Sequence, residues 1–141
     1  MSDLVIDASV AVKWFVREDG TDKAGEVLKS DRTLLAPRLI MTEVANALAR
    51  KSHQNLVTPR EASEYVGVLP RFVAKLLDVD DLIEPALEHA CSYRHPIYDF
   101  IYLEAARRSD TQLLTADERF MARINGTPLA KFVASLFEWR A

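Results

Sequence analysis

Four acidic residues stand where carboxylates could act together. Asp7 ends the apolar run LVI, and Asp117 follows the apolar stretch LLTA. Glu43 lies among apolar neighbours in LIMTEVANAL, and Asp99 stands near the start of YDFIYLEAA. Carboxylates held close together repel and raise one another's pKa, so their convergence would need a cation. Magnesium or manganese is the predicted ion, because these hard cations prefer oxygen ligands and keep several waters.

Each acid taken alone also has an ordinary structural explanation. Asp7, Asp99 and Asp117 each stand where a helix can begin, and a carboxylate there accepts backbone N–H groups and interacts favourably with the helix dipole. Glu43 alone could be a solvated charge on the side of a helix. Whether the four acids converge therefore depends on the elements that carry them.

The elements are predicted from periodicity and from turn residues. Length and composition, 141 residues with 49% hydrophobic side chains, favour one domain over residues 1–141 with a core that needs no disulfide. Strands are expected at 4–6, 33–37 and 111–116, and helices at 9–15, 21–30, 39–51, 58–69, 80–94, 98–110 and 117–124, while 73–79 could be either. This alternation predicts an α/β fold, a three-layer α/β/α sandwich with a mainly parallel central sheet.

The fold class gives the strand-end acids a location. Active crevices of such folds lie at the carboxyl ends of the strands, so Asp7 and Asp117 should project into one crevice. The stretch 39–51 is the clearest predicted helix, because its apolar residues recur at three- and four-residue spacings. Thr58 and Glu61 have the spacing of a capping box, and Pro70 is expected to break or kink the helix that they begin.

The apolar runs, the N-terminus, the single cysteine and the histidines lead to expectations about localisation and chemistry. No apolar run approaches the roughly 18 residues of a spanning helix, and the N-terminus has no basic leader, so we expect a cytoplasmic protein without membrane contact. The single cysteine, Cys91, is expected to be a small buried thiol. His53, His89 and His95 are expected to be structural.

The stretches VIDASVAVKWF, APRLIMTEVANAL, HPIYDFIYLEAA and LLTADERF, in this order, resemble PIN domains, and most closely the VapC-type toxin ribonucleases of type II toxin-antitoxin pairs. The resemblance covers residues 4–120. It implies one PIN domain with an α/β/α sandwich, and a magnesium- or manganese-dependent endoribonuclease that hydrolyses RNA phosphodiester bonds. It further implies a homodimer and a cognate VapB-type antitoxin, with DNA bound only through the antitoxin.

The resemblance also assigns the site residues. The acidic quartet of the family falls on Asp7, Glu43, Asp99 and Asp117, and hydroxyls often found beside it fall on Ser9 and Thr115. We expect Ser9, Thr115 and Asn46 to hold the carboxylates in ligating orientations, because hydroxyls and amides do this without adding charge. Some members of the family carry a further acidic residue at the position of Arg119. Because an arginine cannot ligate a metal ion as that acid would, this chain departs from the pattern expected for a fully occupied second metal site.

The charge balance is compatible with RNA as a substrate. The formal net charge is −3, whereas nucleic-acid binders are usually basic. With the four pocket acids set aside, however, basic residues slightly outnumber acidic ones. Arg119 is the first candidate for contacting phosphate, since it lies two residues after Asp117. Trp14 either packs in the core or lines the groove where the resemblance places an antitoxin.

Other functions remain as alternatives. A haloacid dehalogenase phosphatase needs a second acid where this chain has Ser9. A receiver-type signalling module needs an acidic pair and a late lysine, for which Lys131 is a weak candidate. A non-catalytic binding module would not need four intact acids. A housekeeping PIN-fold nuclease that processes RNA or DNA differs from the toxin mainly in partners and substrate.

Overall fold

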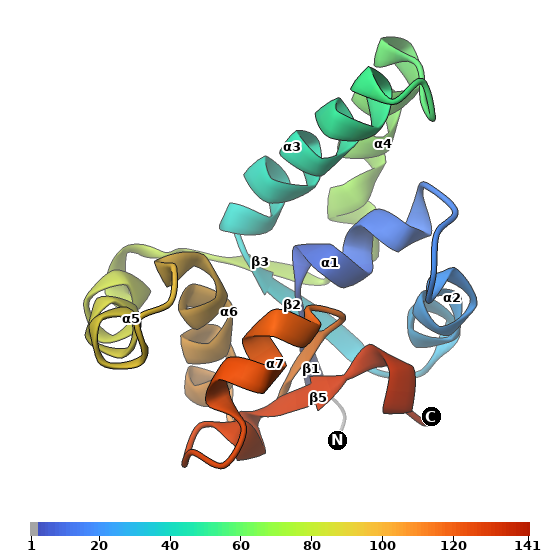
Figure 1. Ribbon diagram of the computed structural model, residues 1–141. Helices are drawn as coiled ribbons and strands as arrows, with labels where there is room; N and C mark the ends of the chain where they lie inside the picture. Colours follow the sequence, from blue (N-terminus) through green and yellow to red (C-terminus); the bar gives the residue numbers. More distant parts are fainter. Residues whose placement is uncertain (1–2) are drawn as a thin grey trace.

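The computed structural model describes residues 3–141, in which five strands form one parallel sheet (Figure 1). The strands are β1 (Asp3–Ile6), β2 (Thr33–Pro37), β3 (Lys75–Leu77), β4 (Leu113–Thr115) and β5 (Val133–Ser135). Their order is β3-β2-β1-β4-β5, and every neighbouring pair is parallel. The predicted α/β class is therefore confirmed, and the ambiguous segment 73–79 contains a strand. The edge strand β5 was not predicted.

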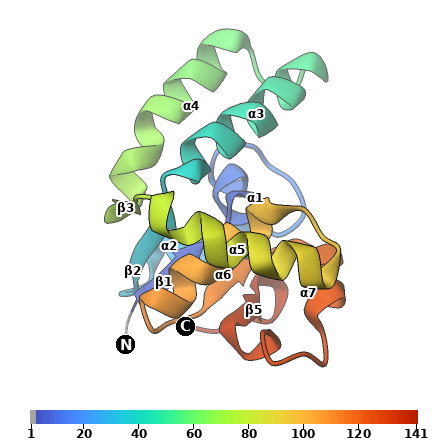
Figure 2. The ribbon, with the colours of Figure 1, turned by 90° about the vertical axis from the view of Figure 1, so that its left-hand side faces the viewer.

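Helices cover both faces of the sheet (Figures 1 and 2). Helix α6 packs against β1, β2 and β4, with α5 outside it, while α1 and α2 lie on the other side of the sheet. The helices are α1 (Ala8–Ala11), α2 (Thr21–Lys29), α3 (Leu39–His53), α4 (Pro59–Phe72), α5 (Asp80–Tyr93), α6 (Ile97–Arg108) and α7 (Glu118–Ile124), with 3-10 turns η1 (Val12–Trp14), η2 (Ala130–Phe132) and η3 (Leu136–Glu138).

The core lies between the sheet and these helices. β1 is at the centre of the sheet, and its residues Leu4, Val5 and Ile6 are all buried, as the uninterrupted apolar run predicts. In α6 every residue from 100 to 106 is buried, including Glu104. This burial fixes the position of α6, and with it the residues of its first turn.

Helices α3 and α4 pair and project away from the sheet (Figures 1 and 2). Aromatic packing attaches α4 to the segment that follows η1. Phe15 stacks on Tyr65 and Phe72 of α4, with ring centroids 5.2 Å and 5.8 Å apart. Trp14 packs edge-on against Phe72, and its indole N–H donates a hydrogen bond to the Ala24 carbonyl at 2.9 Å. Trp14 therefore has a packing role, and its assignment to a partner groove is not supported.

Two local predictions were wrong and one was confirmed. Thr58 and Glu61 form the reciprocal capping box, with hydrogen bonds of 3.0 and 2.9 Å. Pro70 does not break α4, which continues to Phe72; a proline in the last turn disturbs little of the helix that precedes it. Cys91 is exposed on α5 rather than buried. Within residues 3–141, no helix has the length and apolar character needed to cross a membrane.

Candidate active site

Two of the four acids follow neighbouring strands at the same edge of the sheet. β1 and β4 are paired in parallel with Ile6 opposite Leu114, and the amide of Asp7 extends this pairing by donating to the Leu114 carbonyl at 3.1 Å. Asp117 comes two residues after the end of β4. Parallel pairing thus brings together two carboxylates that are 110 residues apart in the sequence, as predicted.

Two hydroxyls hold the Asp7 carboxylate. The hydroxyls of Ser9 and Thr115 each donate to Asp7 Oδ2 at 2.7 Å. The same hydroxyl oxygens accept hydrogen bonds in turn, Ser9 Oγ from the amide of Ala116 and Thr115 Oγ1 from the amide of Asp117, both at 3.0 Å. Asp7 is thereby fixed in one orientation, and the predicted positioning roles of Ser9 and Thr115 agree with these contacts.

Capping explains one of the strand-end acids and not the other. Asp117 Oδ1 accepts a hydrogen bond from the amide of Phe120 at 3.1 Å, so Asp117 caps α7. Asp7 stands at the N-cap position of α1, but its side chain makes no capping hydrogen bond. Asp117 therefore has a structural role whatever else it does, whereas the buried Asp7 needs another explanation.

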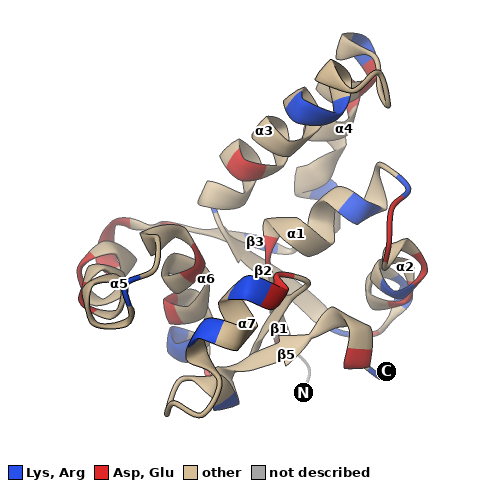
Figure 3. Ribbon diagram, viewed as in Figure 1, with Lys and Arg blue, Asp and Glu red and all other residues tan. Residues whose placement is uncertain are grey.

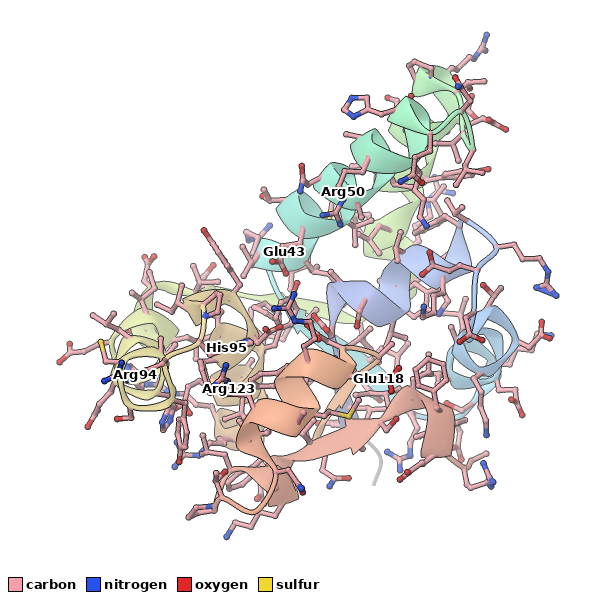
Figure 4. All side chains as sticks on the ribbon, viewed as in Figure 1. Glu43, Arg50, Arg94, His95, Glu118 and Arg123 are labelled. Carbon is pink, nitrogen blue, oxygen red and sulfur yellow. The ribbon has the colours of Figure 1, made fainter. Side chains whose placement is uncertain are left out.

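Glu43 and Asp99 complete the group from two helices. Glu43 lies in the second turn of α3 and Asp99 in the first turn of α6, not at its cap. Both line one cleft of about 830 Å³ together with Asp7 and Asp117. All four predicted acids thus face a single cavity, and Figure 4 shows Glu43 extending from α3 toward the sheet.

The acids perturb one another, as crowded like charges should. Burial raises the pKa of Glu43 to about 7, and the charges of Asp7, Asp99 and Asp117 add to the rise. Burial likewise raises the pKa of Asp99 to about 6, although a hydrogen bond with His95 opposes the change. Burial raises the pKa of Asp7 as well, against the lowering effect of the Ser9 and Thr115 hydroxyls.

His95 borders this site, a contact that was not predicted from the sequence. Its Nε2 lies 2.7 Å from Asp99 Oδ2, and its ring packs against Phe120 with centroids 5.3 Å apart. Figure 4 shows His95 between α6 and α7. A histidine four residues before the candidate acid was the available sequence signal. By contrast, His89 contacts Glu104 and lies outside the cleft, which fits a structural role.

The other predicted site residues, Asn46 and Arg119, form no hydrogen bond with the four acids in the described part of the chain. Asn46 lines the cleft, but it makes no side-chain hydrogen bond to a carboxylate among the described residues. Arg119 is exposed and is not among the residues that line the cleft, so its contact with phosphate stays a prediction. Sequence reasoning missed Tyr102, whose hydroxyl is buried close to Glu43 and makes no hydrogen bond of good geometry within residues 3–141. Burial and the charges of Asp7 and Glu43 raise its pKa.

The chemistry of this donor set fits a hard divalent cation. The acids supply oxygen ligands only, and their mutual repulsion is what a cation would relieve. Among residues 3–141, no three His, Cys, Asp or Glu side chains already form a group that could hold a metal ion. The four carboxylates line an open cleft, an arrangement compatible with an ion that keeps several of its waters.

Comparisons with known proteins agree with this fold. The model of the PIN domain family matches residues 4–126. Ribonuclease VapC3 of Pyrobaculum aerophilum is 27% identical over 118 residues, which are 82% of this chain and 90% of VapC3.

Two solved structures share the fold. PAE2754 of Pyrobaculum aerophilum has a TM-score of 0.68 at 20% identity, covering 96% of this chain and 85% of that one. VapC20 of Mycobacterium tuberculosis, a toxin that cleaves the sarcin-ricin loop, has a TM-score of 0.70 at 17% identity, covering 84% of this chain and 93% of its own.

Proposed function

Because this chain belongs to the PIN domain family, we propose that it is a magnesium- or manganese-dependent endoribonuclease and the toxin of a VapBC-type pair. The observation that carries the proposal is the meeting of Asp7, Glu43, Asp99 and Asp117 in one cleft. Similarity to ribonuclease VapC3 favours RNA as the substrate, and the fold shared with the toxin VapC20 is compatible with the toxin role.

The residues divide the work of hydrolysis in this proposal. Asp7, Asp99 and Asp117 would hold the ion, with Asp7 fixed by Ser9 and Thr115. The bound ion would lower the pKa of a coordinated water and neutralise charge on the phosphate. Glu43 would orient the attacking water and accept its proton, because its carboxylate lines the same cleft as the three ligating aspartates.

The reaction is then an in-line hydrolysis. The oxygen of water forms a bond to phosphorus as the bond from phosphorus to the leaving ribose oxygen breaks, and the leaving oxygen takes up a proton. No histidine has to act as the base, because Glu43 faces the cleft. His95 would act through Asp99 as a positioning residue.

Partners follow from the same proposal. As a VapC-type toxin, the chain would form a homodimer and would be inhibited by a VapB-type antitoxin, through which alone it would contact DNA. A small reading frame directly upstream, with a DNA-binding N-terminal half, is the expected source of the antitoxin. Copurification of its product with this chain would support the pairing.

Expression of the chain in bacteria tests the toxin role. We expect the parent to slow growth and the Asp7→Asn, Glu43→Gln and Asp99→Asn variants not to do so, because the amides keep shape and remove charge. Coexpression of the upstream frame should restore growth. Equal growth arrest by the parent and by all three variants, at matched protein levels, would contradict the proposed function.

A further inference from the structure

The cleft that contains the four acids also has a basic end. Lys13, Arg50 and Lys51 line it together with Glu18 and Gln54. Lys13 belongs to η1, whereas Arg50 and Lys51 stand in the last turns of α3. Figure 3 shows the acidic turn of α3 nearer the sheet and the basic turn farther along the same helix. None of these basic residues has a part in the hydrolysis proposed above.

Glu18 forms ion pairs with the two lysines of this group. Lys13 Nζ donates to Glu18 Oε2 at 2.8 Å, and Lys51 Nζ donates to Glu18 Oε1 at 2.5 Å. Burial alone would raise the pKa of Glu18, but the hydrogen bonds and charges of the two lysines lower it, so Glu18 is ionised. One carboxylate between two ammonium groups leaves an excess positive charge facing the cleft.

The lysines still have hydrogen-bond donors to offer. An ammonium group has three donors. Among residues 3–141, Glu18 is the one side-chain hydrogen-bond acceptor of Lys13 and of Lys51, and Arg50 has no ion-pair partner. Lys13 is only 7% exposed, which is rare for a lysine, and the small exposed part faces the cleft. The alternative is that these ion pairs serve only to attach the loop of residues 15–20 to α3. That structural role would not require Arg50, which lies in the same cleft without an ion-pair partner among the described residues.

The distance between the two ends of the cleft restricts the ligand. Glu43 and Arg50 are seven residues apart on α3, roughly 11 Å along the helix axis at about 1.5 Å per residue. Both side chains extend from the side of α3 that faces α1 (Figure 4). A single phosphate group cannot contact both ends, whereas a strand with successive phosphates can.

We infer that Lys13, Arg50 and Lys51 bind an RNA phosphate that flanks the scissile one, with Glu18 positioning the two lysines. This inference rests on the proposed nuclease function and adds to it a second phosphate-binding end of the same cleft. The acidic end receives the scissile phosphate, and the basic end receives a neighbouring phosphate of the same strand. A dinucleotide, with one phosphate, uses only the acidic end.

Substrate length separates the two ends experimentally. Two substrates are compared, a ten-nucleotide RNA and a dinucleotide. The cleavage of each is measured with the parent, with Arg50→Gln, with Lys51→Gln and with the double variant. Lys13 is left intact because it is buried. For the double variant we expect KM of the longer RNA to rise at least about tenfold, because the loss of a single charged hydrogen bond is already worth roughly that factor, with kcat unchanged. Cleavage of the dinucleotide should not change. The controls Arg71→Gln and Lys75→Gln remove exposed charges outside the cleft.

Binding without cleavage distinguishes a failure of this inference from a failure of the proposed function. In the Asp99→Asn background, loss of Arg50 and Lys51 should reduce the salt dependence of binding to the ten-nucleotide RNA by about 0.7 per lost phosphate contact. If the salt dependence falls in this way but the parent cleaves no RNA, the proposed nuclease function is refuted and the basic subsite stands. A parent that cleaves RNA, with an unchanged KM and salt dependence in the double variant, would overturn the subsite and leave the nuclease.

Discussion

His95 Nε2 lies 2.7 Å from Asp99 Oδ2, although the two residues lie on either side of the proline that precedes α6. The imidazole packs against the ring of Phe120, and the amide of Phe120 donates to the capping carboxylate of Asp117. Two carboxylates of the site are therefore connected through one histidine and one phenylalanine. A change at His95 should reach the acids without removing any of them.

Replacing His95 by phenylalanine tests this connection. His95→Phe keeps an aromatic ring against Phe120 but removes the hydrogen bond to Asp99, so Asp99 should lose its fixed orientation. We expect the magnesium concentration for half-maximal cleavage to rise about 10- to 100-fold, the usual effect of losing a partner that orients a ligand. The same substitution at the exposed His53 is the control. An unchanged metal requirement in His95→Phe would show that the contact is incidental.

The metal-free protein should become less stable as the pH rises from about 5 to 8. The pKa of Glu43 is raised to about 7 and that of Asp99 to about 6, above their ordinary values of 4.5 and 3.8. In this range the folded state binds more protons than the unfolded state, so the free energy of unfolding falls with increasing pH. Thermal melting in a chelator at several pH values measures it. Glu43→Gln should show a shallower decrease, and a parent that melts at a higher temperature at pH 8 than at pH 5.5 would contradict the crowding of charges.

Magnesium should stabilise the parent and not Asp99→Asn. At ~10 mM ion and an assumed dissociation constant of ~1 mM, mass action gives about 1.4 kcal/mol. For a chain of this size that is roughly 2 to 5 °C in Tm. In the absence of metal, Asp99→Asn should fold at least as stably as the parent, because one repelling charge is gone. Equal shifts of Tm in both proteins would place the ion elsewhere.

Thr115 should matter through its hydroxyl alone. It is fully buried, donates to Asp7 and accepts from the amide of Asp117. Thr115→Val keeps the shape and leaves both partners short of a hydrogen bond, which should cost about 1 to 3 kcal/mol in the free energy of unfolding. It should also lower cleavage activity. Thr115→Ser retains the hydroxyl and should recover most of both, so equal losses in the two variants would contradict this role.

Much of the fold followed from local patterns in the sequence. The apolar run before Asp7 predicted the central strand because a fully buried strand has no polar face. The alternation of strands and helices then predicted the parallel sheet, and the position of strand ends in such sheets predicted that Asp7 and Asp117 meet. Glu43 and Asp99 joined them through the family resemblance, since helical periodicity alone does not say which face of a helix meets a crevice.

The features that were missed depend on tertiary contacts. β5 has three residues with ordinary composition, and only its pairing with β4 identifies it as a strand. The contact of His95 with Asp99 needs the turn at Pro96, and the network of Lys13, Glu18 and Lys51 joins η1, the loop after it and α3. Long side chains on separate elements leave no periodic signal that would show they meet.

Cleavage of RNA by the purified chain tests the central claim most directly. A single-stranded RNA is incubated with the parent, Glu43→Gln and Asp99→Asn, with magnesium or manganese and with a chelator. We predict internal cleavage by the parent that the chelator abolishes and added ion restores, and none above background by either variant at matched concentration and folding. Cleavage that persists in the chelator, or in purified Asp99→Asn at the rate of the parent, would contradict a metal-dependent site built on these acids.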